Sequence, residues 1–313
     1  MMMELGLMVE PQLGGTYDDL LALAQWADQA GLDSFARSDH YLHNDTNAHA
    51  TDALISLAGL ARETKQIKLT TLVSPLTFRN PAVMAKSAAT IDEMSGGRME
   101  LGVGTGWMAS EHDSFGLELP DLSERFSRLY ETLAYLHAAF GRKDGGFSGR
   151  HYHLDDMDVL PRPTGKLPII IGGSGMKKTP TFAGKFADEY NMFVTDDETL
   201  TERRQVMQQA AINAGRSPGD IKISFVGPAF VGDTEKEGLE KLAEHAVSHG
   251  QDPEQLETSM RGKHVPIGSR DQAFATMQEL TDLGVGRYYC QVFKPLADID
   301  FVNLDTVFSA LRG

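Results

Sequence analysis

The sequence predicts a closed barrel of parallel strands surrounded by helices, the (β/α)8 or TIM barrel of the α/β class. Short apolar, β-branched runs alternate with helical patterns along the whole 313-residue chain. We count eight strand–helix pairs, the number that closes such a barrel. No shift in composition and no linker divides the chain, so we expect one domain over residues 1–313. A doubly wound open sheet is the alternative, because a sequence does not show closure.

The strands are predicted from short runs of apolar and β-branched residues. In chain order these runs are Leu5–Glu10, Ser34–Ser38, Ile67–Ser74, Arg98–Gly104, Pro168–Gly172, Tyr190–Thr195, Ile221–Val231 and Arg287–Phe293.

The helices are predicted from apolar residues that recur at the helical period. They are Tyr17–Ala30, Asp52–Glu63, Pro81–Met94, Leu122–Phe140, Lys177–Phe186, Leu200–Ala214, Glu235–His249 and Ser269–Leu283. Pro81 suits a first helical position, where the missing N–H is not needed. Glycines follow where helices are expected to end, at Gly31, Gly96, Gly141, Gly215 and Gly284.

Two connections are longer than an ordinary βαβ unit. Residues 107–166, approximately, follow the fourth strand and contain a predicted hairpin at Phe147–Val159. A polar stretch, residues 250–268, follows the seventh strand. We predict that both are insertions above the barrel mouth.

The composition excludes several classes of function. The formal charge of −15 argues against non-specific binding to nucleic acid or to an anionic membrane. Cys290 is the only cysteine, so there is no disulfide framework, and we expect it in the core. The N-terminus lacks the pattern of a secretory signal, and no run approaches the length of a membrane span. We therefore predict a soluble, cytoplasmic protein that acts on a small molecule.

Candidate chemistry lies where the predicted strands end, because barrel enzymes place their active sites there. The second strand leads into Asp39 and His40, an acid–base pair that can donate a proton or orient an imidazole. A loop histidine satisfied by solvent is the alternative. The fourth strand leads into Gly104, Gly106 and Trp107, where alternating glycines let a ligand approach the backbone.

The fifth strand is followed by a glycine-rich turn, Gly172–Gly175, and then by a helix. Backbone N–H groups at a helix N-terminus, with Lys177 and Lys178 beside them, are typical of a phosphate site. The turn lacks the GK[ST] ending of a nucleotide P-loop. A plain turn that requires glycine is the alternative, but the small residues followed by two lysines favour phosphate binding.

A metal site has little support. His40, His43, Asp45 and His49 are close in sequence, but the first strand lacks the His-x-His with which metal-dependent barrel hydrolases begin. The pair His151 and His153 is explained by a solvated hairpin face. We predict no bound metal.

Several segments, in this order and at these spacings, resemble the bacterial-luciferase-like superfamily of flavin and deazaflavin oxidoreductases. They extend over nearly the whole chain: Ala30–Ser34, Ser38–His40, Phe78–Ala82, Ala85–Asp92, Ser95–Arg98, Leu101–Trp107, Ser148–Tyr152, Pro168–Gly175 and Ala187–Asn191. The resemblance implies a TIM barrel with a flavin or deazaflavin ring at its mouth.

The resemblance also implies which residues would bind the cofactor. They are Asp39, His40, Thr71, Leu72, Val73, Gly104, Gly106, Trp107, Gly172, Gly173, Ser174, Gly175, Met176 and Asn191. Gly172–Gly175 would hold the phosphate, and the backbone at Thr71–Ser74 would lie against the central ring. Members of the family often have a non-proline cis peptide there, and the resemblance leaves open which bond it is.

The pair Asp39 and His40 resembles that of the branch that uses coenzyme F420, a deazaflavin with a phosphate and an acidic oligoglutamate tail. His40 would donate or orient the proton, and Asp39 would help to fix its tautomer or the ring. Trp107 stands where the sugar-phosphate dehydrogenases of that branch carry a glutamate. This difference argues against a sugar-phosphate substrate.

Three functions follow from these observations. We favour hydride transfer between F420 and a small organic molecule. An FMN-dependent monooxygenase or reductase is the first alternative, because FMN also carries a phosphate. A barrel that binds a flavin without turnover is the second. The family tendency is a dimer packed through barrel helices, so we expect a homodimer.

Overall fold

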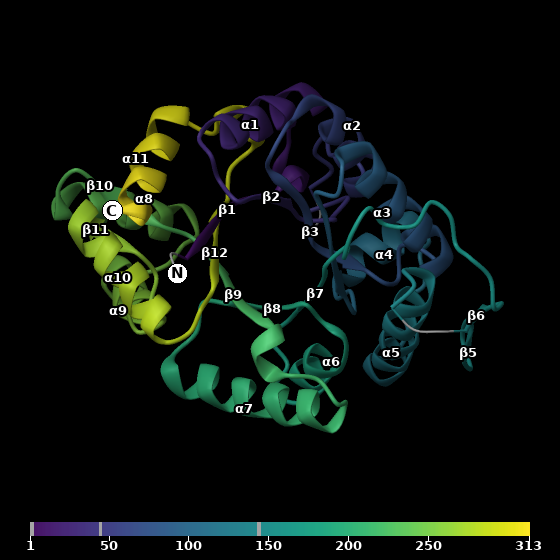
Figure 1. Cartoon of the computed structure of the whole chain (residues 1–313). Coiled ribbons are helices and arrows are strands. Elements are labelled where there is room, and N and C mark those ends of the chain that lie inside the picture. The colour runs from purple at the N-terminus through teal and green to yellow at the C-terminus, as the bar shows by residue number, and fades with distance from the viewer. Residues whose placement is uncertain (1–2, 44–45, 143–144) are drawn as a thin grey trace.

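Eight parallel strands close into a barrel inside a ring of helices (Figure 1). The structure is a computed structural model that describes residues 3–43, 46–142 and 145–313. The strands follow one another around the barrel in the order β1-β12-β9-β8-β7-β4-β3-β2. The predicted (β/α)8 fold is confirmed, and the open-sheet alternative is wrong.

The barrel strands correspond to the eight predicted runs. They are β1 (Glu4–Val9), β2 (Ser34–Arg37), β3 (Lys68–Pro75), β4 (Met99–Gly104), β7 (Ile169–Gly172), β8 (Glu189–Phe193), β9 (Lys222–Gly227) and β12 (Arg287–Val292). One run is wrong in its extent. The predicted strand Ile221–Val231 is divided, because Pro228 has no N–H to donate to a neighbouring strand. After it, β10 (Phe230–Gly232) leaves the barrel and pairs with β11 (Ile267–Ser269).

All eight predicted helices are present. They are α1 (Tyr17–Gln29), α2 (Ala53–Glu63), α3 (Pro81–Ser95), α5 (Leu122–Ala139), α6 (Lys178–Phe186), α7 (Asp197–Asn213), α8 (Glu235–Ser248) and α10 (Arg270–Asp282). The five glycines predicted to end helices all adopt left-handed φ angles between 67° and 78°.

Three helices were not predicted: α4 (Ala109–Phe115), α9 (Pro253–Arg261) and α11 (Phe301–Arg312). The helix α11 follows β12 and completes the outer ring. It packs on α1, where the rings of Trp26 and Phe308 lie 5.6 Å apart.

The two insertions differ in part from the predicted position above the barrel mouth. The helix α4, at the start of the first insertion, contacts the segment after β2 through Glu111, but the other segments lie elsewhere. The hairpin of β5 (Phe147–Ser148) and β6 (His153–Leu154) forms as expected, but it lies beyond α5 at the outer edge of the molecule (Figure 1). Glu131 of α5 accepts hydrogen bonds from the backbone N–H groups of Arg150 and His151, both 2.8 Å long. The stretch 250–268 contains α9 and the start of β11, and β10 and β11 lie beside α8 and α10, outside the strand ring. Neither the hairpin nor the stretch 250–268 therefore covers the barrel mouth.

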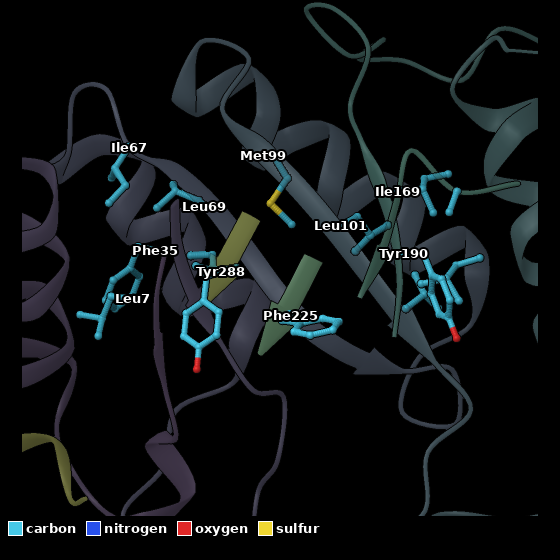
Figure 2. Close-up of a cluster of buried hydrophobic side chains, with 14 of the residues drawn as sticks. Leu7, Phe35, Ile67, Leu69, Met99, Leu101, Ile169, Tyr190, Phe225 and Tyr288 are labelled. Carbon is cyan, nitrogen blue, oxygen red and sulfur yellow. The ribbon is translucent and has the colours of Figure 1, made fainter. Parts of the chain in front are cut away.

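Alternate residues of each strand point outward and form the main core with the helices (Figure 2). Leu7, Phe35, Leu101, Tyr190 and Phe225 are fully buried in this layer. Cys290 belongs to the same layer, as predicted, and burial raises the pKa of its thiol to about 12.

The inward-facing residues fill the barrel in layers. At the N-terminal ends of the strands, Arg287 binds the carboxylates of Glu100 at 2.7 Å, Glu189 at 3.0 Å and Glu4 at 2.7 Å. Above this ionic layer lies an apolar cluster of Met8, Ala36, Leu72, Ile170, Val226 and Tyr289. These two layers close the barrel from below and leave the C-terminal mouth as the end at which a ligand can bind.

Within the described residues, no helix is both long and apolar enough to cross a membrane.

Candidate active site

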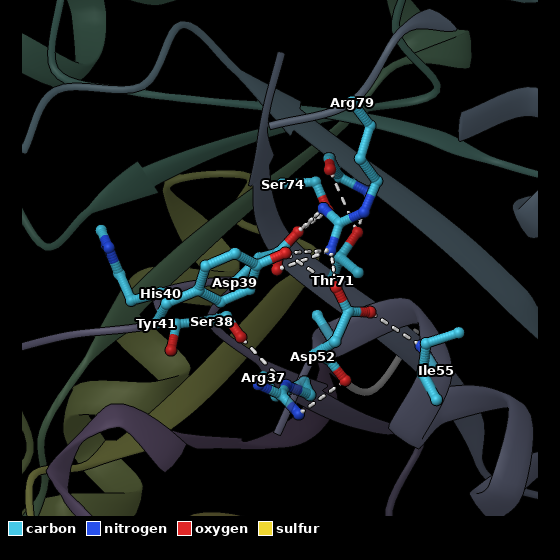
Figure 3. Close-up of polar contacts among 12 residues, drawn as sticks. Arg37, Ser38, Asp39, His40, Tyr41, Asp52, Ile55, Thr71, Ser74 and Arg79 are labelled. Atoms are coloured by element: carbon cyan, nitrogen blue, oxygen red, sulfur yellow. Dashed lines mark hydrogen bonds and ion pairs between the residues drawn. The ribbon is translucent and has the colours of Figure 1, made fainter. Parts of the chain in front are cut away.

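Asp39 lies just after β2 and is held by cationic and hydroxyl donors. Its side chain is fully buried and accepts a hydrogen bond of 2.6 Å from the hydroxyl of Ser74. Arg79 donates to the same carboxylate through both terminal nitrogens and also contacts Asp52 (Figure 3). Burial lowers the pKa of Arg79, but the charge of Asp39 and its hydrogen bond outweigh that effect and raise it. Asp39 thus ties the end of β2 to β3 and to the loop before α3.

His40 points away from this network, as Figure 3 shows. Its Nδ1 lies 3.0 Å from Oε2 of Glu111, whose side chain is 1% exposed. The other oxygen of Glu111 accepts hydrogen bonds from the backbone N–H groups of Tyr41 and Leu42. The carboxylate that contacts the imidazole is therefore Glu111 of α4. Asp39, which the resemblance implies would help to fix the tautomer or the ring, contacts Ser74 and Arg79 instead.

The contact with Glu111 sets the protonation of His40. Burial lowers the pKa of His40, but the hydrogen bond to Glu111 and the charge of Glu111 outweigh burial and raise it. Burial raises the pKa of Glu111, but its hydrogen bonds from His40 and from two backbone N–H groups lower it. Because a carboxylate only accepts, Nδ1 carries a proton and Nε2 is the atom left for proton exchange.

Trp107 adjoins the imidazole on the solvent side. The two rings meet edge to face with centroids 5.7 Å apart, and Trp107 is 65% exposed. His40, Trp107 and Glu111 therefore lie together at the barrel mouth, as the sequence predicts for the first two.

The peptide bond between Leu72 and Val73 is cis, which identifies the bond that the resemblance left open. Val73 fills the space beside three glycines of β4 and β7. A Cβ atom at Gly102, Gly104 or Gly172 would lie 2.9, 2.7 or 3.0 Å from a Val73 methyl carbon. These glycines therefore make room for Val73, in addition to any ligand that approaches them.

Thr71 and Leu72 are less accessible than the resemblance implies. Thr71 is fully buried, and its hydroxyl is bonded to the backbone of Gly102 in both directions, at 3.0 Å. Leu72 belongs to the apolar cluster in the barrel.

The Gly172–Gly175 turn connects β7 to α6. In the described ranges, no group accepts a hydrogen bond from the backbone N–H of Ser174, Gly175 or Met176. Asn191 of β8 lies beside the turn and donates to the hydroxyl of Ser224 at 2.9 Å. The predicted phosphate-binding residues and Asn191 are thus together at the mouth.

Arg203 of α7 supports this turn and was not predicted. It donates to the carbonyl of Ser174 at 2.7 Å, and its Nε lies 3.3 Å from the sulfur of Met176. Lys178 is turned toward α5, where its ammonium lies 4.8 Å above the ring of Phe126. Only Lys177 of the two predicted lysines therefore remains a direct candidate for an anion.

The wall of the mouth across from the Gly172–Gly175 turn is a buried polar cluster at the ends of β1, β2 and β12. Glu10 accepts a hydrogen bond of 2.6 Å from Gln12 and another from Gln291 of β12. Gln12 in turn accepts from Ser38, at 2.6 Å. This wall carries a carboxylate with neutral amide partners and was not predicted from the sequence.

No group of three or more His, Cys, Asp or Glu side chains could hold a metal ion in the part of the chain that the structure describes. Asp45, one of the four residues considered for a metal, lies outside that part.

A profile of the family described as luciferase-like monooxygenase matches residues 3–287. Two relatives are named F420-dependent glucose-6-phosphate dehydrogenase. That from Microbacterium testaceum is 34% identical over 65% of this chain and 61% of its own length. That from Kineococcus radiotolerans is 36% identical over 66% of this chain and 64% of its own length. The chain thus spans less than two thirds of the length of these relatives.

Solved structures share the fold at lower identity. An F420-dependent secondary alcohol dehydrogenase in complex with an F420–acetone adduct superposes with a TM-score of 0.81, at 20% identity and over 100% of both chains. A monooxygenase from Streptomyces bottropensis gives a TM-score of 0.80 at 18% identity, over 99% of this chain and 97% of its own.

Proposed function

The chain belongs to the luciferase-like monooxygenase family, and on that basis we propose that it is an oxidoreductase that transfers hydride between coenzyme F420 and a small organic substrate. The observation that carries the proposal is the His40–Glu111 pair at the barrel mouth, across from the Gly172–Gly175 turn. The names of the relatives in Microbacterium testaceum and Kineococcus radiotolerans support F420 as the cofactor.

The residues present fit such a cofactor. Backbone N–H groups of Ser174, Gly175 and Met176 have no acceptor in the described ranges and precede the N-terminus of α6, an arrangement that suits a phosphate. Lys177 is exposed beside them. The cofactor would supply the hydride chemistry, and the protein would bind and orient it.

In this proposal the chain's own residues handle the proton. Nε2 of His40 would give a proton to the substrate oxygen during reduction and take one during oxidation. Glu111 would hold Nδ1 and keep the ring in one tautomer. Asp39 and Arg79 would fix the loop that carries His40, and Trp107 would shield the imidazole from bulk water.

The test measures cofactor binding and turnover separately. Titration of the protein with F420 and with FMN, followed by cofactor fluorescence and Tm, should give micromolar binding of F420 and little stabilisation by FMN. Preferential binding of FMN would replace this proposal with flavin chemistry. Binding of neither would remove the assignment of the Gly172–Gly175 turn as a phosphate site.

His40→Ala should lower kcat about 10²- to 10⁴-fold, the usual contribution of a general acid–base group. The Kd of F420 should change little, because the proposed cofactor contacts lie on other residues. The control is His153→Ala, whose side chain is exposed on the hairpin. An unchanged kcat in His40→Ala would exclude His40 from the mechanism.

We also infer one domain, a homodimer and a cytoplasmic location. The single domain is supported by helices of both long connections that pack beside the barrel. The homodimer rests on the family tendency, and exposed Ile55 and Val83 on α2 and α3 offer an apolar face for it. The reducing location is supported by the single buried cysteine.

A further inference from the structure

Two aromatic side chains follow the inward-facing positions of β8 and β12, two strands that β9 separates, at the mouth of the barrel. On β8, Glu189 and Asn191 face the interior, where they contact Arg287 and Ser224. Phe193 is the next residue of that face and is 56% exposed. On β12, Tyr289 and Gln291 face the interior. Phe293 comes directly after the strand, is 41% exposed, and its ring centroid lies 6.4 Å from that of His245 on α8.

Trp107 adds a third exposed aromatic ring at the same end, edge-on to His40. Each of these three exposed rings would lose water-accessible apolar area against an apolar ligand bound at this end of the barrel, and that loss favours binding. A flavin-type ring and a substrate are the two groups that the proposed function brings to this end.

The charged groups at the mouth do not suit a phosphorylated substrate. Arg79 is neutralised by Asp39 and Asp52, and Arg203 is bonded to the Ser174 carbonyl. Arg125 donates to the carbonyl of Pro120, at 2.9 Å, and to that of Gly106. Arg37 is fully buried and bonded to Thr51 and Ser56.

A buried carboxylate at this end also disfavours a phosphorylated substrate. Glu10 is buried there with the neutral amides of Gln12 and Gln291 as its hydrogen-bond partners, and its carboxylate would repel a phosphate dianion. Lys294 is exposed beside Phe293 and is a single ammonium in water, where it gives little binding energy.

We propose that the substrate is an uncharged, largely apolar alcohol or carbonyl compound that packs against Trp107, Phe193 and Phe293, and not a sugar phosphate. The inference rests on the proposed function. In oxidation, the carbinol C–H bond breaks and its electron pair leaves as hydride to reduce F420. The hydroxyl proton passes to His40, and a C=O bond forms. Reduction of the carbonyl compound is the reverse.

The test has a binding readout that does not depend on turnover. Trp26 and Trp107 are the two tryptophans, and Trp26 lies on the outer helix α1, so Trp26→Phe leaves Trp107 as the sole reporter. Benzyl alcohol, cyclohexanol and glucose 6-phosphate are titrated into this variant with F420 bound. We expect a saturable change in Trp107 emission with both alcohols and none with glucose 6-phosphate.

Turnover of the same probes is followed by the loss of F420 absorbance. Phe193→Ser and Phe293→Ser should each raise KM for benzyl alcohol about tenfold with a smaller effect on kcat, since they remove apolar contact and leave His40 in place. Ile212→Ser is the control, because Ile212 is 58% exposed on α7, away from the mouth.

The outcomes separate the inference from the proposed function. Higher kcat/KM for glucose 6-phosphate than for benzyl alcohol, or no response of Trp107 to either alcohol, would overturn the inference and leave F420 chemistry intact. Failure to bind F420 would overturn the proposed function itself.

Discussion

At the scale of single residues, two buried carboxylates that contact the segment after β2 or belong to it have different partners. Asp39 is bound by Arg79, whereas Glu111 is bound by His40 and two backbone N–H groups. A carboxylate paired with a permanent cation fixes the position of the segments that carry the two groups. A carboxylate paired with an imidazole also sets the proton affinity of that imidazole. The first therefore orders the loop, and the second tunes the proposed acid–base group.

Glu111→Gln should shift the pH dependence of carbonyl reduction to lower pH. Reduction needs protonated His40, so the rate falls as pH rises through the pKa of His40, which Glu111 raises. Without that charge, burial lowers the pKa and the fall begins at lower pH, while Gln still accepts from the N–H groups of Tyr41 and Leu42. The pH profile of kcat measures the shift.

Glu118→Gln is the matched control for this change. Glu118 is 70% exposed and contacts Arg128, so its substitution should leave the profile in place. An unmoved profile in Glu111→Gln would show that Glu111 does not act through His40.

The sequence predicted His40, Asp39 and Trp107 because each follows a predicted strand, where barrel sites form. Glu111 and Arg203 could not be found this way. Their roles depend on how α4 and α7 pack. In the sequence Glu111 belongs to an acidic segment that was not predicted as a helix, and Arg203 looks like an ordinary charged residue of a surface helix. The contact between Arg203 and the Ser174 carbonyl joins residues 29 positions apart, which periodicity does not reveal.

At the scale of elements, α7 holds the β7–α6 turn in place through Arg203. Arg203→Ala should raise the Kd of F420 about tenfold and leave the pH profile of kcat unchanged. The reason is that an ordered loop binds with less entropy loss than a mobile one. Cofactor fluorescence measures the Kd.

Arg204→Ala serves as its comparison. Arg204 is the next residue of α7 and donates to the carbonyl of Leu283, away from the turn. Equal losses of affinity in both variants would mean that Arg203 acts only through the general stability of α7.

The elements themselves were largely predictable, because strand and helix periods and terminal glycines are local signals. The wrong or missing predictions concern segments whose secondary structure depends on tertiary contacts. The polar segment of α9 lacks a buried face, since none of its residues is fully buried, so the helical period is weak there. The separation of β10 from β9 depends on pairing with β11, whose residues lie 37 positions away.

At the scale of the whole molecule, the ionic layer at the base of the barrel joins strands that are distant in sequence. Arg287→Met should lower the free energy of unfolding by about 3–5 kcal/mol, because it leaves the buried carboxylates of Glu100 and Glu189 without their cation. Arg270→Met, which removes an exposed ion pair with Asp233, should cost at most about 1 kcal/mol. Urea unfolding measures both values, and equal losses would show that the layer contributes no more than a surface pair.

The net charge of the whole molecule should govern how fast the cofactor arrives. A chain of charge −15 repels F420, which carries a phosphate and an acidic tail, and salt screens that repulsion. We expect the association rate constant of F420 to rise about threefold to tenfold between roughly 10 and 150 mM salt. The deazaflavin nucleoside without phosphate and tail has less charge and should show little change. Stopped-flow fluorescence measures both rates, and a rate for F420 that falls with salt would instead reveal a local cationic path to the turn, with Lys177 as its first candidate.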